Sequence, residues 1–179
     1  MRLASRDDYA EVCLERWGAF AASCTQEEVV IIEGCVLQST VRFLFAKCED
    51  ERSIRDYWER FEKSIAPLAA RFVYLYQDDS AEFMRSRTLV RRGADWVEKV
   101  ANYAVGTELG RTRGWQGEDG MVAFWMEYRA LCDDLYQRST TCKLALENTT
   151  QYWSQLHTRI VDWVMDPSPQ PPGRFESAP

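Results

Sequence analysis

The sequence predicts an all-α fold, in which a single bundle of seven or eight helices surrounds a central helix. Apolar residues recur with the 3.6-residue period of a helix along most of the 179 residues. We find no alternation of apolar and polar residues that is long enough to indicate a strand instead. Hydrophobic residues make up 46% of the chain, which at this length is enough for a core without disulfide bonds or metal ions.

The helical domain is expected over residues 1–166. Its first helix should cover residues 5–22 and its second residues 25–47, where Thr25 and Glu28 have the spacing of a capping box. The second helix is apolar on most sides, so we expect it to lie between other elements. Residues 167–179 contain five of the six prolines and are expected to form a disordered tail.

The third helix has the clearest amphipathic pattern. Ser53 is expected to cap it, and its apolar residues follow helical spacing. These residues are Ile54, Tyr57, Trp58, Phe61 and Ile65. After Pro67 the pattern predicts a short helix over residues 68–76 and a further helix over residues 81–91.

The central helix is expected to begin at Trp96, where Gly93 precedes a second capping-box spacing from Asp95 to Glu98. A glycine-rich segment over residues 110–120 predicts one long exposed loop. A helix over residues 121–136 and one or two helices within residues 142–165 complete the predicted bundle.

The composition argues against several classes of protein. The net charge of −6 lacks the basic footprint of a nucleic-acid binder. No stretch approaches the ~20 apolar residues of a membrane span, and the first residues do not resemble a signal peptide. The six cysteines form no Cys-x-x-Cys pair, which indicates reduced, buried thiols in an intracellular protein.

The sequence does not indicate an enzyme. The single histidine, His157, is expected to be exposed, and no motif places a nucleophile beside it. Neighbouring carboxylates such as Asp133 and Asp134 diverge on a helix, and the cysteine spacing does not indicate a zinc site. The glycine-rich segment lacks the Gly-Lys-Ser/Thr ending of a phosphate-binding loop, so no cofactor is expected.

Residues 85–92 are unusual in an acidic chain because they contain Arg85, Arg87, Arg91 and Arg92. One interpretation is a solvated helix face with internal salt bridges. The other is a binding site for an anionic partner.

Residues 89–100 combine an aliphatic helix end, a glycine and a helix that opens with Asp95 and Trp96. Upstream lie the apolar helix and the third helix, and Trp153 and Trp163 follow downstream. In this order the chain resembles, over residues 5–165, the B-cell lymphoma 2 (Bcl-2) family of apoptosis regulators, including its herpesvirus members.

The resemblance implies a Bcl-2-like helical bundle and a non-enzymatic, anti-apoptotic regulator. Such a protein would bind the amphipathic Bcl-homology-three helix of a pro-apoptotic partner in a hydrophobic groove. It would work in the cytoplasm, or at the mitochondrial surface through its partners, and a homodimer remains open. The partner-binding residues that the resemblance implies are Phe61, Phe72, Tyr76, Met84, Val90, Arg91, Arg92, Trp96, Val97 and Val100.

Two departures from the family pattern bear on this function. Glu98 stands where the family has an arginine that pairs with the ligand's aspartate, so Arg91 or Arg92 would have to supply the cation. Val97 stands where the family has a glycine. Two alternatives therefore stay open: a helical adaptor or viral signalling antagonist with a closed groove that uses an outer face, and a helical bundle with a small-molecule pocket in its core.

Overall fold

The computed structural model describes residues 6–25, 29–77, 80–148 and 152–166. The described chain is mostly helical, as predicted, but it also contains one parallel sheet of two strands, which the sequence analysis did not predict. The expected tail over residues 167–179 lies outside the described residues.

Helix α1 (Arg6–Ser23) and helix α3 (Glu51–Ile65) pack side by side. All five apolar residues of the stripe predicted for the third helix are buried, so that prediction is confirmed. The helix begins after Asp50 rather than at Ser53, because the Asp50 carboxylate accepts the Ser53 amide at 3.0 Å. Asp50 is thus the residue that caps α3.

The prediction of one helix over residues 25–47 is wrong in its first third. A π-helix over Val36–Val41 leads into α2 (Arg42–Ala46), whereas residues 29–33 are neither helix nor strand. Gly34, with φ of +65°, separates the two parts in a conformation that glycine adopts readily. The expected capping box involves Glu28, which lies outside the described residues.

Strands β1 (Arg71–Tyr76) and β2 (Cys142–Glu147) replace helix predicted over residues 68–76 and at the start of 142–165. They run parallel, with Arg71 opposite Cys142 and Tyr76 opposite Glu147. In β1, Phe72, Tyr74 and Tyr76 alternate onto one face, a pattern that aromatic residues favour in strands. Burial against α8 explains why these residues form a strand rather than the predicted helix, because the rings of Tyr74 and Tyr136 stack with centroids 5.2 Å apart.

A helical run follows β1, close to the helix predicted over residues 81–91. It consists of α4 (Ser80–Phe83), a π-helix (Met84–Leu89) and α5 (Val90–Arg92). Helix α6 (Ala94–Gly106) comes next and begins after Gly93, with no side-chain cap, so the second capping box does not form.

The central helix is α8 (Gly117–Arg138), not the helix near Trp96. Helix α6 buries only Ala101 and Ala104, whereas α8 buries residues from Gly120 to Tyr136. The predicted loop over residues 110–120 is largely helical, because α7 (Glu108–Arg113) and the first turn of α8 occupy most of it.

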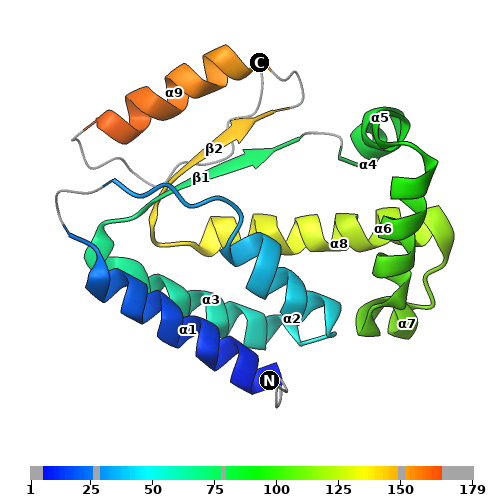
Figure 1. Cartoon of the computed structure of the whole chain (residues 1–179), viewed down its shortest axis with the longest axis horizontal. Helices are drawn as coiled ribbons and strands as arrows, with labels where there is room; N and C mark the ends of the chain where they lie inside the picture. The colour runs from blue at the N-terminus through cyan, green and yellow to red at the C-terminus, as the bar shows by residue number, and fades with distance from the viewer. Residues whose placement is uncertain (1–5, 26–28, 78–79, 149–151, 167–179) are drawn as a thin grey trace.

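Helix α9 (Trp153–Met165) closes the described chain. Two guanidinium nitrogens of Arg71 donate to the carbonyls of Trp163 and Asp166, which joins the end of α9 to the start of β1. In Figure 1 the sheet lies between α9 above and α8 below, and α1 to α3 lie beneath α8. Within the described residues, none of the helices is both long enough and apolar enough to cross a membrane.

A buried carboxylate joins α3 to the turn between α8 and β2. Glu62 is 7% exposed and accepts the backbone amides of Thr140 and Thr141, each at 3.0 Å, and the hydroxyl of Ser139. Burial acts to raise the pKa of Glu62, but these hydrogen bonds outweigh it and hold the pKa below the ordinary value. The carboxylate is therefore charged at neutral pH.

Lys143 completes this buried connection from the other side. Its ammonium donates to the carbonyls of Tyr136, Gln137 and Ser139 at 2.7 to 2.8 Å, which satisfies the free carbonyls at the end of α8. Burial lowers the pKa of Lys143, and the charge of Glu62 opposes that shift.

We predict that Glu62→Gln lowers the free energy of unfolding by about 2 to 4 kcal/mol, since charged hydrogen bonds are lost and an amide donor faces backbone donors. Because the folded pKa lies below the unfolded value of about 4.3, the Glu62 contribution is present at neutral pH and is lost on acidification through the folded pKa. Urea unfolding at pH 7 and at a series of lower pH values, continued until the difference no longer changes, measures both effects. Glu59→Gln, at an exposed position of α3, is the control. A difference between Glu62→Gln and the unchanged protein that persists in acid would contradict the assignment.

The six cysteines are free, as predicted, but they are not all buried. Cys35 and Cys48 are exposed, whereas Cys132 is buried and burial raises its pKa to about 12.

We predict that an alkylating reagent at pH 8 modifies Cys35 and Cys48 first and Cys132 at least about 1,000-fold more slowly, because the thiolate is the reactive form. Mass spectrometry of peptides over time measures this order. Equal rates for Cys48 and Cys132 would contradict it.

Candidate functional site

The two parallel strands end at the same edge of the sheet. Tyr76 and Glu147 are opposite one another there, and the amide of Asn148 donates to the carbonyl of Tyr76 at 2.7 Å. Ligands of open parallel sheets bind beyond the carboxyl ends of the strands, where the following loops and helix N-termini converge. This carboxyl edge is therefore a candidate binding site.

Arg129 of α8 fixes the chain where it leaves β1. Its guanidinium donates to the carbonyl of Gln77 at 2.6 Å and to the Asp133 carboxylate at 2.7 Å, and lies 5.7 Å from the ring centroid of Tyr76. The neighbouring Tyr74 hydroxyl also donates to Asp133, at 2.8 Å. Because Asp133 balances its charge, we assign Arg129 to holding the edge in place.

A buried acceptor lies at the end of β2. The side-chain oxygen Oδ1 of Asn148 is shielded from solvent and accepts no hydrogen bond from the described residues. A buried acceptor without a donor is uncommon in proteins, and such atoms often face a ligand or an ordered water.

The arginine-rich segment begins at Arg85, after β1 and α4 in the chain. Arg85 lies 2.9 Å from Asp119, so part of the segment has the internal salt bridges of the first interpretation. Arg91 and Arg92 are exposed, and neither pairs with a carboxylate among the described residues. The guanidinium of Arg92 lies 5.5 Å from the ring centroid of Trp96. The side chain of Arg87 lies outside the described residues.

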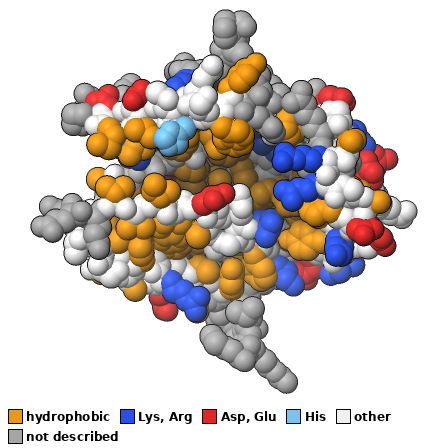
Figure 2. Space-filling model, turned by 45° about the horizontal axis from the view of Figure 1, so that its top comes forward, with side chains coloured by type: hydrophobic (Ala, Val, Ile, Leu, Met, Phe, Trp, Pro, Cys, Tyr) orange, Lys and Arg blue, Asp and Glu red, His pale blue; other side chains and the backbone are white. Residues whose placement is uncertain are grey.

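The surface in the view of Figure 2 is hollowed at its centre. Figure 2 shows Lys and Arg side chains gathered on the right of the view, where Figure 1 places α4, α5 and α6. They border a hollow whose floor is formed by hydrophobic side chains. An acidic side chain also lies at the lower edge of the hollow, so an anion would be favoured on the side where the Lys and Arg side chains gather.

The N-terminus of α6 adds to this positive potential. It begins after Gly93, whose φ is 81°, and no side chain caps it, so its first amides lack intrahelical acceptors. Arg91 and Arg92 come directly before it in the chain. Asp95 in the first turn offsets part of the potential, since it is exposed and acidic.

The structure places the predicted partner-binding residues in two groups. Phe61 and Phe72 belong to the core beside Trp58, with ring centroids 5.4 and 5.7 Å from the Trp58 ring. The other eight lie between the end of β1 and the middle of α6 in the chain, and one of them, Tyr76, is at the carboxyl edge. These are Tyr76, Met84, Val90, Arg91, Arg92, Trp96, Val97 and Val100.

Exposure differs within this second group. Tyr76 is buried, and Val90, Arg91 and Arg92 are exposed, with Val90 at 77%. The remaining four are half-buried: Met84, Trp96, Val97 and Val100. The structure therefore brings together the cationic and α6 residues of the prediction, but it does not bring Phe61 or Phe72 to the same surface.

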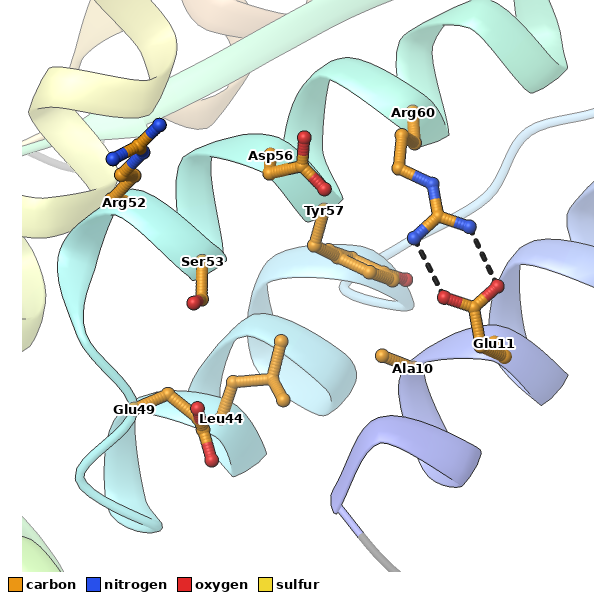
Figure 3. A pocket seen from close by; sticks show the side chains of 9 residues that line it. All are labelled: Ala10, Glu11, Leu44, Glu49, Arg52, Ser53, Asp56, Tyr57 and Arg60. Carbon is orange, nitrogen blue, oxygen red and sulfur yellow. Dashed lines mark hydrogen bonds and ion pairs between the residues drawn. The ribbon is translucent and has the colours of Figure 1, made fainter.

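A second hollow lies between α1, α2 and α3, with a volume of about 350 Å³ (Figure 3). Glu11 and Arg60 pair across it through two hydrogen bonds of 2.6 Å, and the hydrogen bond from Arg60 lowers the pKa of Glu11. Ser53 is bound to Asp50. With these groups paired, few polar atoms converge on a ligand, so we assign this pocket to helix packing. Its lining residues are Ala10, Glu11, Leu44, Glu49, Arg52, Ser53, Asp56, Tyr57 and Arg60.

Sequence reasoning missed Arg129 and Asn148. Asn148 begins an Asn-x-Thr glycosylation pattern, which does not indicate a ligand site. Arg129 lies in no motif and contacts Gln77 across 52 positions of the chain, so no local spacing could have indicated the contact. His157 is exposed, as predicted. Within the described residues, no cluster of three or more histidines, cysteines or carboxylates could hold a metal ion. No protein-family model, characterised protein or solved structure matches this chain.

Proposed function

We propose that this protein binds a phosphorylated ligand at the carboxyl edge of the β1–β2 sheet. Arg91 and Arg92 would hold the phosphate, and the uncapped N-terminus of α6 would add backbone donors. The observation that carries the proposal is that these two exposed arginines have no carboxylate partner among the described residues of an acidic protein.

The chemistry of arginine supports a phosphate rather than another anion. A guanidinium presents several donors in one plane, and this arrangement matches two oxygens of a phosphate group. Each charged hydrogen bond contributes about 1.5 to 3 kcal/mol, so two arginines that each donate two such bonds contribute about 6 to 12 kcal/mol, a range that includes the ~8 kcal/mol of a micromolar Kd. Asp95 and Glu98 lie one turn away and would repel an anion that sat further along α6.

We predict that Arg91→Ala and Arg92→Ala each weaken tripolyphosphate binding about tenfold or more, because each removes one charged contact. Titration calorimetry measures the affinity, and raising the ionic strength should lower it. Arg52→Ala is the control, since Arg52 is an exposed arginine on α3. Unchanged binding in the Arg91 and Arg92 variants, or an equal loss with Arg52→Ala, would contradict the proposal.

An exposed apolar residue favours a second candidate function. Val90 is 77% exposed and stands next to Arg91, and Trp96 is half-exposed on the following helix. An amphipathic helix with one acidic residue could place its apolar face on Val90 and its carboxylate near Arg91. This supports the apoptosis regulator that binds a Bcl-homology-three helix, here on an outer surface rather than in a groove that includes Phe61.

For this second candidate we predict that Val90→Ser weakens the best-bound of a panel of Bcl-homology-three peptides about tenfold, through lost apolar burial. Glu98→Arg should strengthen it, because a like charge near the ligand's aspartate becomes an attractive one. Calorimetry with the same protein samples measures both changes. Val90→Ser should leave tripolyphosphate binding unchanged, which separates the two candidates. If no peptide binds more tightly than about 100 μM, the second candidate fails.

A further inference from the structure

We propose that the phosphorylated ligand is a lipid, and that the protein binds the surface of a membrane that contains a phosphomonoester lipid such as phosphatidic acid. This inference rests on the proposed phosphate site, because Arg91 and Arg92 hold the headgroup in it. It adds that Val90 enters the apolar layer below the headgroups.

The turn between α5 and α6 combines apolar and cationic side chains. Val90 is 77% exposed and stands directly before the exposed Arg91 and Arg92. Gly93, with φ of 81°, then leads the chain from α5 into α6. Figure 1 shows α5 at the upper right of the molecule. An exposed aliphatic residue beside two cations is suited to a membrane surface, where apolar and anionic groups lie in adjacent layers.

Trp96 fits the same orientation. It is half-buried, and the guanidinium of Arg92 lies 5.5 Å from its ring centroid. Tryptophan is favoured at the level of the lipid headgroups, because its ring has a large apolar part and one polar N–H group. A guanidinium that stacks on an aromatic ring keeps its donors in its own plane, so Arg92 can still bind a phosphate. Arg92 and Trp96 are therefore compatible with the same layer of the membrane.

The acidic residues nearby restrict the kind of anionic lipid that fits. Asp95 lies in the first turn of α6 and Glu98 is exposed one turn later, so both would repel a diffuse negative charge. Binding therefore needs direct hydrogen bonds between the guanidinium groups and a headgroup. A phosphomonoester has three acceptor oxygens and a charge of about −1.5 to −2 at neutral pH. The phosphodiester of phosphatidylserine has fewer free oxygens and less charge.

The net charge of −6 does not prevent this contact. At physiological ionic strength, charges further than about 8 Å from the membrane are largely screened. Each arginine near an anionic surface strengthens binding about fivefold, and burial of one valine side chain strengthens it about tenfold or more. Reversible membrane binding commonly combines an apolar group with basic residues, and Val90, Arg91 and Arg92 provide both in consecutive positions.

The test is cosedimentation of the full chain with phosphatidylcholine vesicles that contain about 20% phosphatidic acid, at up to about 1 mM lipid. Vesicles with about 40% phosphatidylserine have at least the same surface charge, and pure phosphatidylcholine is the neutral control. The protein should bind the phosphatidic acid vesicles, bind the phosphatidylserine vesicles at least about fivefold more weakly, and leave the neutral vesicles unbound.

Variants separate the lipid contact from the phosphate contact. Val90→Ser should weaken binding to phosphatidic acid vesicles about tenfold and leave tripolyphosphate binding unchanged, because only the membrane contacts this valine. Arg91→Ala should weaken both. Met165→Ser is the matched control, since Met165 is 75% exposed at the end of α9, on the opposite side of Figure 1 from α5. It should bind both ligands like the unchanged protein.

A second arm uses the unchanged protein, so that a folding defect in a variant cannot decide the result. Excess tripolyphosphate should release the protein from the vesicles, because it occupies the same arginines, and sodium chloride of equal ionic strength should release less.

The outcomes distinguish this inference from the proposed function. Three results would overturn the inference alone: tripolyphosphate binding without vesicle binding, equal affinity for phosphatidylserine vesicles, or the same vesicle affinity in Val90→Ser and Met165→Ser. Failure of tripolyphosphate to bind would instead overturn the proposed function, and the inference with it.

Discussion

The contact between the Glu62 carboxylate and the turn over residues 139–141 determines how the two halves of the chain meet. Glu62 belongs to α3, whereas the turn joins α8 to β2, so this carboxylate sets where β2 begins relative to the helical layer. β1 pairs with β2 in a fixed register, and this pairing determines where the carboxyl edge lies. A buried charge is stable only when its hydrogen bonds are complete. The turn must therefore keep the Ser139 hydroxyl and the Thr140 and Thr141 amides directed at the Glu62 carboxylate.

Helical periodicity predicted the parts of the fold in which one face of a helix is buried against a neighbour. The stripe of α3 and the core of α8 are of this kind, because an apolar residue at every third or fourth position leaves few alternatives to a helix. It failed at β1, where residues 68, 72, 75 and 76 have helical spacing while 72, 74 and 76 have strand spacing. Packing against Tyr136, 60 positions or more along the chain, decides between the two.

At the candidate site, too, local sequence patterns predicted some residues, whereas others depend on tertiary contacts. The sequence picked out Arg91 and Arg92, because four arginines in eight residues stand out in an acidic chain. It could not pick out Asn148 or Arg129, whose positions at the site depend on the strand pairing and on α8. It grouped Phe61 with these arginines through a family resemblance, although the aromatic contacts of Phe61 with Trp17 and Trp58 belong to the core. Charge clusters can therefore be found from sequence, but the groups that position them require the tertiary structure.

The parallel pairing of β1 with β2 also has a consequence for synthesis. Arg71 pairs with Cys142, so the two partners are 71 positions apart in the chain. At a translation rate of about 5 to 20 residues per second, β1 emerges from the ribosome several seconds before β2 exists to pair with it. During that interval the aromatic strand β1 cannot yet pair with β2. A chaperone that shields extended apolar segments would act on this chain at that stage.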